Sequence, residues 1–251
     1  MPMSLRGSRT SVGLAVALSG LILALQGCGG GPAAHTRQPT ERHGTVAIIG
    51  DAYMSGTDPS NPHLGMADTV AEDLGMNLSS FASGGTGYLR KGPPGHENYR
   101  IQARKASKVD ADLYIVYGGA QDWINISVEE NKTRGDLAEA VRKVFDTLTK
   151  GHPGRDVIVV GPIWPAFPID KGAYKVRDVI KREAAAADLP FVDPIEDQWL
   201  TPTNSSEYLG PDRLRPSESG KAYFSDLIAQ AVRENFGEDL GLPSADPSPS
   251  G

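Results

Sequence analysis

The chain has 251 residues, of which 25 are basic and 31 acidic, so its formal net charge at pH 7 is −6. The sequence contains no basic stripe suited to a phosphate backbone, and we therefore expect no nucleic-acid partner. The single cysteine, Cys28, excludes an intramolecular disulfide and a multi-thiolate metal site, and no other spacing suggests a metal or a cofactor.

Residues 1–27 have the features of a bacterial export signal. Arg6 and Arg9 give a basic start, and the apolar stretch 12–25 is shorter than the roughly 20 residues that span a bilayer. The signal ends in Leu-Gln-Gly-Cys at 25–28, which resembles a lipobox, whose cysteine carries a lipid in the mature protein. An ordinary secretory signal is the alternative, but the only cysteine stands at the lipobox position. We therefore expect lipidation of Cys28 and export to the outer face of the bacterial membrane, where the lipid serves as the anchor.

The remainder of the chain divides by composition into three parts. Residues 28–43 are rich in glycine, proline and polar residues, which predicts a flexible tether. Residues 44–237 fit one domain with a sizeable core, and 238–251 have the composition of a disordered tail. Removal of 1–27 takes away two arginines, so the mature chain would carry 23 basic and 31 acidic residues, a net charge of −8.

Apolar runs and amphipathic repeats alternate along the domain. Strands are predicted at 45–50, 78–82, 113–117, 157–160 and 191–192. Helices are predicted at 65–74, 98–108, 137–148, 176–187 and 219–235. This alternation indicates the α/β class, as a flavodoxin-like three-layer α/β/α sandwich with a mainly parallel sheet of about five strands. Ligands bind such sheets outside the carboxyl ends of the strands.

Four short motifs lie at strand ends or near the end of the domain. They are Ile-Gly-Asp-Ala-Tyr at 49–53, Ser-Gly-Gly-Thr-Gly at 83–87, Gly-Gly-Ala-Gln-Asp at 118–122 and Asp-Arg-Leu-Arg-Pro at 212–216. In this order they resemble the blocks of the SGNH (GDSL) hydrolase family, which has Gly-Asp-Ser, a glycine, Gly-X-Asn-Asp and Asp-X-X-His-Pro there. The resemblance runs from Ile48 to about Ala231 and implies an SGNH-hydrolase-like fold.

The resemblance also assigns catalytic roles to five positions. The family's nucleophile falls at Ala52, and its base falls at Arg215. Its oxyanion donors fall at Gly84, through the backbone N–H, and at Gln121, through the side chain. Asp212 retains the acid that orients the base.

Most of this chemistry is missing from the residues present. Ala52 has no oxygen with which to form an acyl-enzyme, and the guanidinium of Arg215 stays protonated and cannot accept a proton. Gln121 is one methylene longer than asparagine, which displaces its donor by about 1.5 Å. We therefore expect a pseudoenzyme in which the Asp212 carboxylate forms an ion pair with Arg215, whose guanidinium reaches into the former nucleophile space. An arginine turned to solvent is the alternative.

Other residues offer substitutes for the missing groups. Ser55, one turn beyond Ala52, is an alternative nucleophile, although a serine there is more often a turn residue. His63 and His96 lie in loops that can border the cleft, but a solvated loop histidine is the simpler interpretation.

The ligand-binding positions that we expect follow the strand ends. They are Asp51, Gly84, Gly85, Gln121, Trp123 and Trp164. The two tryptophans would form an apolar wall for an acyl chain or a stacking surface for a sugar ring, and ordinary packing is the alternative. Tyr53, Tyr88 and Trp199 are further aromatic candidates.

Two functions remain open from the sequence. The first is a membrane-anchored SGNH-family protein that binds an acyl, glycan or protein ligand without hydrolysing it. The second is an active esterase, lipase or acyltransferase that works by an altered mechanism. The family resemblance favours the second, and the residues at the catalytic positions favour the first.

Overall fold

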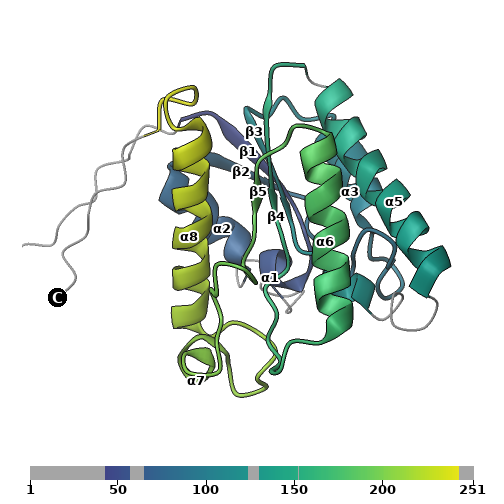
Figure 1. Cartoon of the computed structure of the whole chain (residues 1–251). Helices are drawn as coiled ribbons and strands as arrows, with labels where there is room; N and C mark the ends of the chain where they lie inside the picture. Colours follow the sequence, from purple (N-terminus) through teal and green to yellow (C-terminus); the bar gives the residue numbers. More distant parts are fainter. Residues whose placement is uncertain (1–42, 57–64, 124–129, 152, 243–251) are drawn as a thin grey trace, which may run out of the picture. The chain divides into compact units, whose positions relative to one another are not determined.

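The computed structural model describes residues 43–56, 65–123, 130–151 and 153–242 (Figure 1). Within them, five parallel strands form one sheet in the order β2-β1-β3-β4-β5. The strands are β1 (Thr45–Ile49), β2 (Asn77–Ser80), β3 (Leu113–Tyr117), β4 (Asp156–Val160) and β5 (Phe191–Val192). The central strands are apolar throughout because both faces of the sheet are covered, which is why the sequence located them within one residue.

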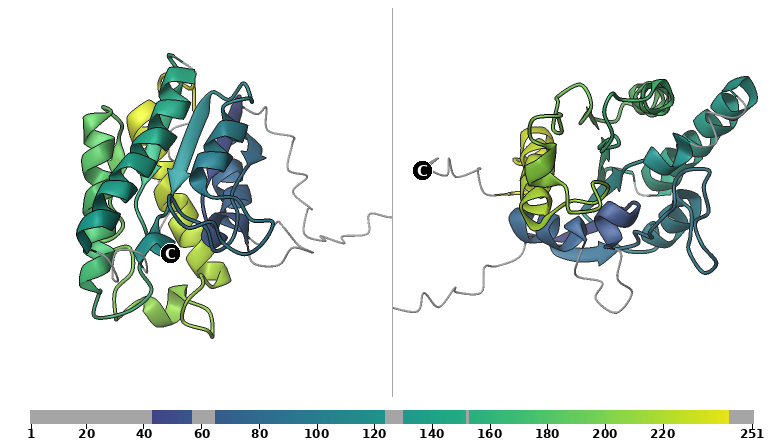
Figure 2. Two further views of the ribbon diagram at one scale, coloured as in Figure 1. Left: turned by 90° about the vertical axis from the view of Figure 1, so that its right-hand side faces the viewer. Right: turned by 90° about the horizontal axis from the view of Figure 1, so that it is seen from below.

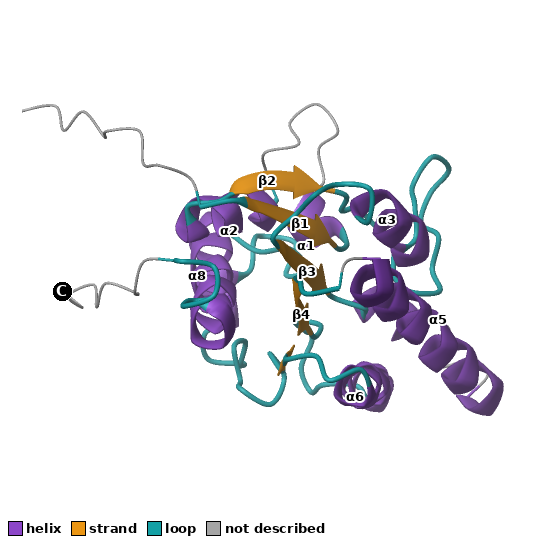
Figure 3. Ribbon diagram, turned by 90° about the horizontal axis from the view of Figure 1, so that it is seen from above, coloured by secondary structure: helices purple, strands orange, loops and turns teal. Residues whose placement is uncertain are grey.

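Helices cover both faces of the sheet. They are α1 (Ala52–Ser55), α2 (Met66–Leu74), α3 (Tyr99–Ala106), the 3₁₀ helix η2 (Ala120–Asp122), α5 (Glu130–Gly151), α6 (Lys171–Ala186), α7 (Ser205–Tyr208) and α8 (Glu218–Phe236). Figures 2 and 3 show α3, α5 and α6 on one face and α2 and α8 on the other. The predicted three-layer α/β/α sandwich is therefore confirmed. No helix in the described part of the chain is both long and apolar enough to cross a membrane.

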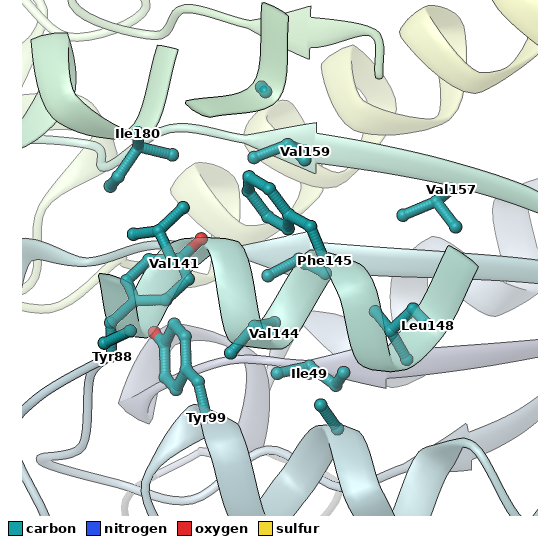
Figure 4. Close-up of a cluster of buried hydrophobic side chains, with 14 of the residues drawn as sticks. Ile49, Tyr88, Tyr99, Val141, Val144, Phe145, Leu148, Val157, Val159 and Ile180 are labelled. Atoms are coloured by element: carbon teal, nitrogen blue, oxygen red, sulfur yellow. The ribbon is translucent and has the colours of Figure 1, made fainter. Parts of the chain in front are cut away.

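Alternate side chains of each strand enter two separate cores. Val116 and Val159 pack with α3, α5 and α6 in the first core, which Figure 4 shows around Phe145. Ile115 and Ile158 point to the opposite face and pack with α2 and α8. Each face of the sheet therefore carries its own packed apolar core.

The structure differs from the sequence prediction mainly at element ends. Helix α5 begins at Glu130, where the sequence has few apolar residues to mark a helix, and α1 is a single turn that apolar periodicity does not reveal. The folded part also continues past 237, because Leu240 and Leu242 pack against the second core. Cys28 and the segment 1–42 lie outside the described residues.

Candidate active site

The tip of β1 places residue 52 at the carboxyl end of the sheet. Asp51 is buried and caps α1, since its Oδ1 accepts a hydrogen bond of 3.0 Å from the Tyr53 N–H. Burial raises the pKa of Asp51 to about 7, although that N–H bond acts in the opposite direction. Asp51 therefore orders the turn, and Ala52 follows it as the first, half-buried residue of α1. Because the Asp51 side chain is buried, it exposes little surface to a ligand, which we had expected it to contact.

The structure brings the second motif against the first. A Cβ atom built on Gly84 would lie 3.7 Å from the Ala52 Cβ, 3.8 Å from the His96 Cε1 and 3.9 Å from the Ser55 Oγ. One point beside Gly84 is therefore in van der Waals contact with a methyl group, an imidazole and a hydroxyl. The neighbouring Gly85 has a φ of 72°, a conformation that favours glycine, and it forms the turn that presents Gly84.

His96 is a site neighbour that the sequence did not favour. Its Nδ1 lies 2.5 Å from the Gly84 carbonyl oxygen, and because a carbonyl only accepts, Nδ1 is the donor. The neutral ring then carries its lone pair on Nε2, as a proton acceptor requires. No pattern in the sequence connects His96 to Gly84, because a turn of unpredictable conformation separates them. His63, the other loop histidine, lies outside the described residues.

Ser55 lies near the same point but is not activated. Its Oγ donates to the Gly56 carbonyl at 2.9 Å, and no hydrogen bond among the described residues joins it to a histidine. A serine nucleophile needs its proton directed at a base. The contacts of Ser55 are instead those of a residue that ends a helical turn.

The last motif contains the expected ion pair. The Nε of Arg215 lies 3.2 Å from the Oδ2 of Asp212, and Asp212 also accepts from the Leu214 and Arg215 N–H groups at 2.9 and 3.0 Å. These two N–H groups lower the pKa of Asp212. The Arg215 side chain is 61% exposed, so most of it faces solvent rather than a closed nucleophile space. The ion pair is correspondingly screened and weak.

Tyr53 joins the last motif to the first. Its hydroxyl donates to the Leu214 carbonyl at 2.6 Å, and its ring stacks on Tyr117 with a centroid distance of 6.1 Å. The sequence suggested Tyr53 only as a pocket aromatic. In the structure, it holds the loop that contains Arg215 beside α1.

The third motif is held by a buried carboxylate that the sequence analysis did not single out. Asp122 accepts hydrogen bonds from the N–H groups of Tyr88, Leu89 and Arg90 at 2.8, 2.9 and 3.1 Å. Burial raises its pKa to about 6 in spite of these bonds. Gln121 lies beside it in η2 and is partly buried. Asp122 thus fixes the third motif against the segment that follows the second.

The aromatic candidates separate into two groups. Trp123 and Trp164 pack edge to face at a centroid distance of 5.9 Å, and the Trp123 Nε1 donates to Asp170 at 2.6 Å. Both are partly exposed and remain candidates for a ligand wall. Tyr88 and Trp199 belong to the cores, with 0% and 6% exposure, so for these two residues the structure supports ordinary packing, the alternative interpretation. Within the described ranges, no three His, Cys, Asp or Glu side chains are grouped to hold a metal.

Comparison with known proteins decides the family. The sequence profile of the GDSL-like Lipase/Acylhydrolase family matches residues 48–223. The chain belongs to this family. GDSL lipase Rv0518 of Mycobacterium tuberculosis is 31% identical over 195 residues, which cover 74% of this chain and 80% of that protein.

Solved structures of other proteins share the fold. A lipase/acylhydrolase from Enterococcus faecalis has a TM-score of 0.56 at 16% identity, covering 80% of this chain and 98% of its own. The acetyl xylan esterase AlAXEase has a TM-score of 0.57 at 17% identity, covering 75% and 99%. The Ala52 side chain has no oxygen that could act as a nucleophile, and the Arg215 guanidinium has no lone pair with which to accept a proton.

Proposed function

We propose that this GDSL-family protein is a lipid-anchored cell-envelope protein that binds an acyl, glycan or protein ligand in the former active site without hydrolysing it. The observation that carries the proposal is the Ala52 methyl group beside Gly84, where a hydrolase of this family needs an oxygen nucleophile. The turn at Asp51 and the hydrogen bond from Tyr53 to Leu214 hold the first and last motifs in place. The proposal is therefore that the reacting groups are missing while the residues around them still form a binding site.

The nearness of Ser55 and His96 favours a second candidate, an esterase or acyltransferase with a relocated nucleophile. In that case Ser55 would be the acylated residue and His96 Nε2 the proton acceptor. The Ser55 hydroxyl bonds to Gly56 instead, so turnover would require α1 to release it. We therefore rank binding first.

We expect the ligand to include an anionic group that pairs with Arg215. Titration of the protein with a medium-chain fatty acid in a calorimeter should give affinity about tenfold weaker for Arg215→Ala, since a charge-assisted hydrogen bond contributes roughly that factor. Arg182→Ala, which removes one exposed positive charge from α6, is the matched control. Equal affinity in wild type and Arg215→Ala would show that this residue does not bind the ligand.

We also expect the protein to partition with membranes through Cys28. A Cys28→Ser variant should move to the soluble fraction, because a lipid chain is the anchor and no helix of the described fold replaces it. Mass spectrometry of the mature N-terminus checks the same point. An unmodified cysteine, or cleavage at another position, would contradict the anchor.

A further inference from the structure

A groove on the surface between α3 and α5 concentrates positive charge. The two helices lie side by side (Figure 3), and the groove between them has a volume of about 280 Å³. It is lined by Arg100, Arg104, Lys143, Asp146, Thr147 and Lys150. Four cations thus face one acid in a chain whose acidic residues outnumber the basic ones by 31 to 25. The groove was not predictable from the sequence because its residues come from two helices that are far apart along the chain.

The two arginines of the groove have no ion-pair partner among the described residues. Lys143 pairs with Glu139, and Lys150 pairs with Asp146 at 3.0 Å. Neither arginine forms a salt bridge within the described residues, although the charge of Arg100 helps Lys143 to lower the pKa of Glu139. These arginines are four residues apart on α3, a spacing at which like charges destabilise a helix. The core contacts of α3 come from its opposite face. Both arginines are exposed and can therefore approach an external anion, with Glu139 offsetting part of the charge of Arg100.

The groove reaches the edge of the sheet at which the chain enters the fold. Helix α5 ends at Gly151, just after Lys150, and β4 begins at Asp156, which is aligned with Leu113. Leu113 is in turn aligned with Val46, the second residue of β1. The Lys150 end of the groove and the start of β1 therefore lie at the same, amino edge of the sheet.

We propose that this groove, Arg100, Arg104, Lys143 and Lys150, binds the phosphate-bearing headgroups of anionic membrane lipids. Guanidinium groups match phosphate oxygens in a bidentate geometry, and clustered basic side chains are attracted to an anionic bilayer. The membrane setting rests on the proposed lipid anchor. The Lys150 end of the groove lies at the amino edge of the sheet, opposite the carboxyl edge that contains Ala52 and Gly84.

Vesicle cosedimentation tests the groove separately from the anchor. A chain that begins at Gly29 lacks Cys28 and retains every described residue, so any binding comes from the protein surface. We expect it to bind vesicles that contain phosphatidylglycerol, to bind phosphatidylcholine vesicles weakly, and to lose binding as salt rises. Arg100→Ala/Arg104→Ala should reduce the partition coefficient about 30-fold, because each basic residue near an anionic surface contributes roughly a factor of five.

A matched double variant controls for charge. Lys171→Ala/Arg182→Ala removes two exposed cations from α6, and thermal unfolding verifies that both double variants are folded. Retained binding in this control supports the groove, whereas equal loss in both variants, or no preference for anionic vesicles, overturns it. Competition by inorganic phosphate at micromolar concentration would show a site for free phosphate and would also overturn a lipid-surface role. The fatty-acid titration of the same preparations reports on the former active site independently.

Discussion

The Ala52→Ser/Arg215→His double variant is expected to form a fluorophosphonate adduct at residue 52 and to hydrolyse nitrophenyl acetate, whereas the wild-type chain does neither. A site without its nucleophile and base retains a rate roughly 10⁶-fold below that of an intact one. The double variant restores both groups beside Gly84 and Asp212, which the structure keeps in place. Gln121 still displaces one oxyanion donor, which costs about 10²- to 10³-fold. We therefore expect a net gain of about 10³-fold in kcat/KM.

The single variants define the cause of that gain. Because the triad acts as a unit, Ala52→Ser alone or Arg215→His alone should remain close to wild type. Intact-protein mass spectrometry counts the adducts, and peptide mapping locates them. Stoichiometric labelling of the wild-type protein at Ser55 would establish the alternative enzyme, and an inert double variant would show that the strand ends do not form a catalytic geometry.

The largest stability effect is expected at Asp122. Replacement by alanine leaves the buried N–H of Tyr88 and the partly buried N–H groups of Leu89 and Arg90 without their acceptor, and we expect the free energy of unfolding to fall by roughly 3 kcal/mol. Urea denaturation at pH 7 measures the change. Asp122→Asn keeps one acceptor oxygen and should lose less.

An exposed aspartate provides the control for this experiment. Asp136→Ala on α5 removes the same charge from the surface and should shift the free energy of unfolding by no more than about 0.5 kcal/mol. If Asp122→Ala unfolds at the same urea concentration as the control, the three N–H groups have found other acceptors, and Asp122 does not hold the third motif in place.

The elements of the fold were predictable where burial leaves a pattern. Strands such as 113–117 are apolar on both faces, and a continuous run of that kind indicates a central parallel strand. The start of α5 was not predictable, because the sequence of its first turns contains few apolar residues. Trp199 shows the limit for aromatic residues, since a tryptophan in the core and one that lines a pocket give the same sequence signal.

The site was predictable only as far as its motifs extend. The order of the motifs correctly placed Ala52 and Gly84 together at the carboxyl end of the sheet. The contact of His96 with Gly84 depends on the conformation of the loop between them. The contact of Tyr53 is with Leu214, more than a hundred positions away, so no local pattern reveals either contact. Asp122 was missed because an aspartate shortly after a pair of glycines usually lies in an exposed turn, and the sequence does not show its three N–H partners.

Asp51 and Ala52 contribute differently to the stability of the fold. Asp51 is buried and caps α1, whereas Ala52 contributes only a half-exposed methyl group to the fold. Arg215 likewise lies mostly in solvent. The stability of the domain therefore depends more on Asp51 than on the side chains at positions 52 and 215. The substitutions that test catalysis at positions 52 and 215 are therefore expected to leave the melting temperature of the domain nearly unchanged, whereas a substitution of Asp51 should lower it.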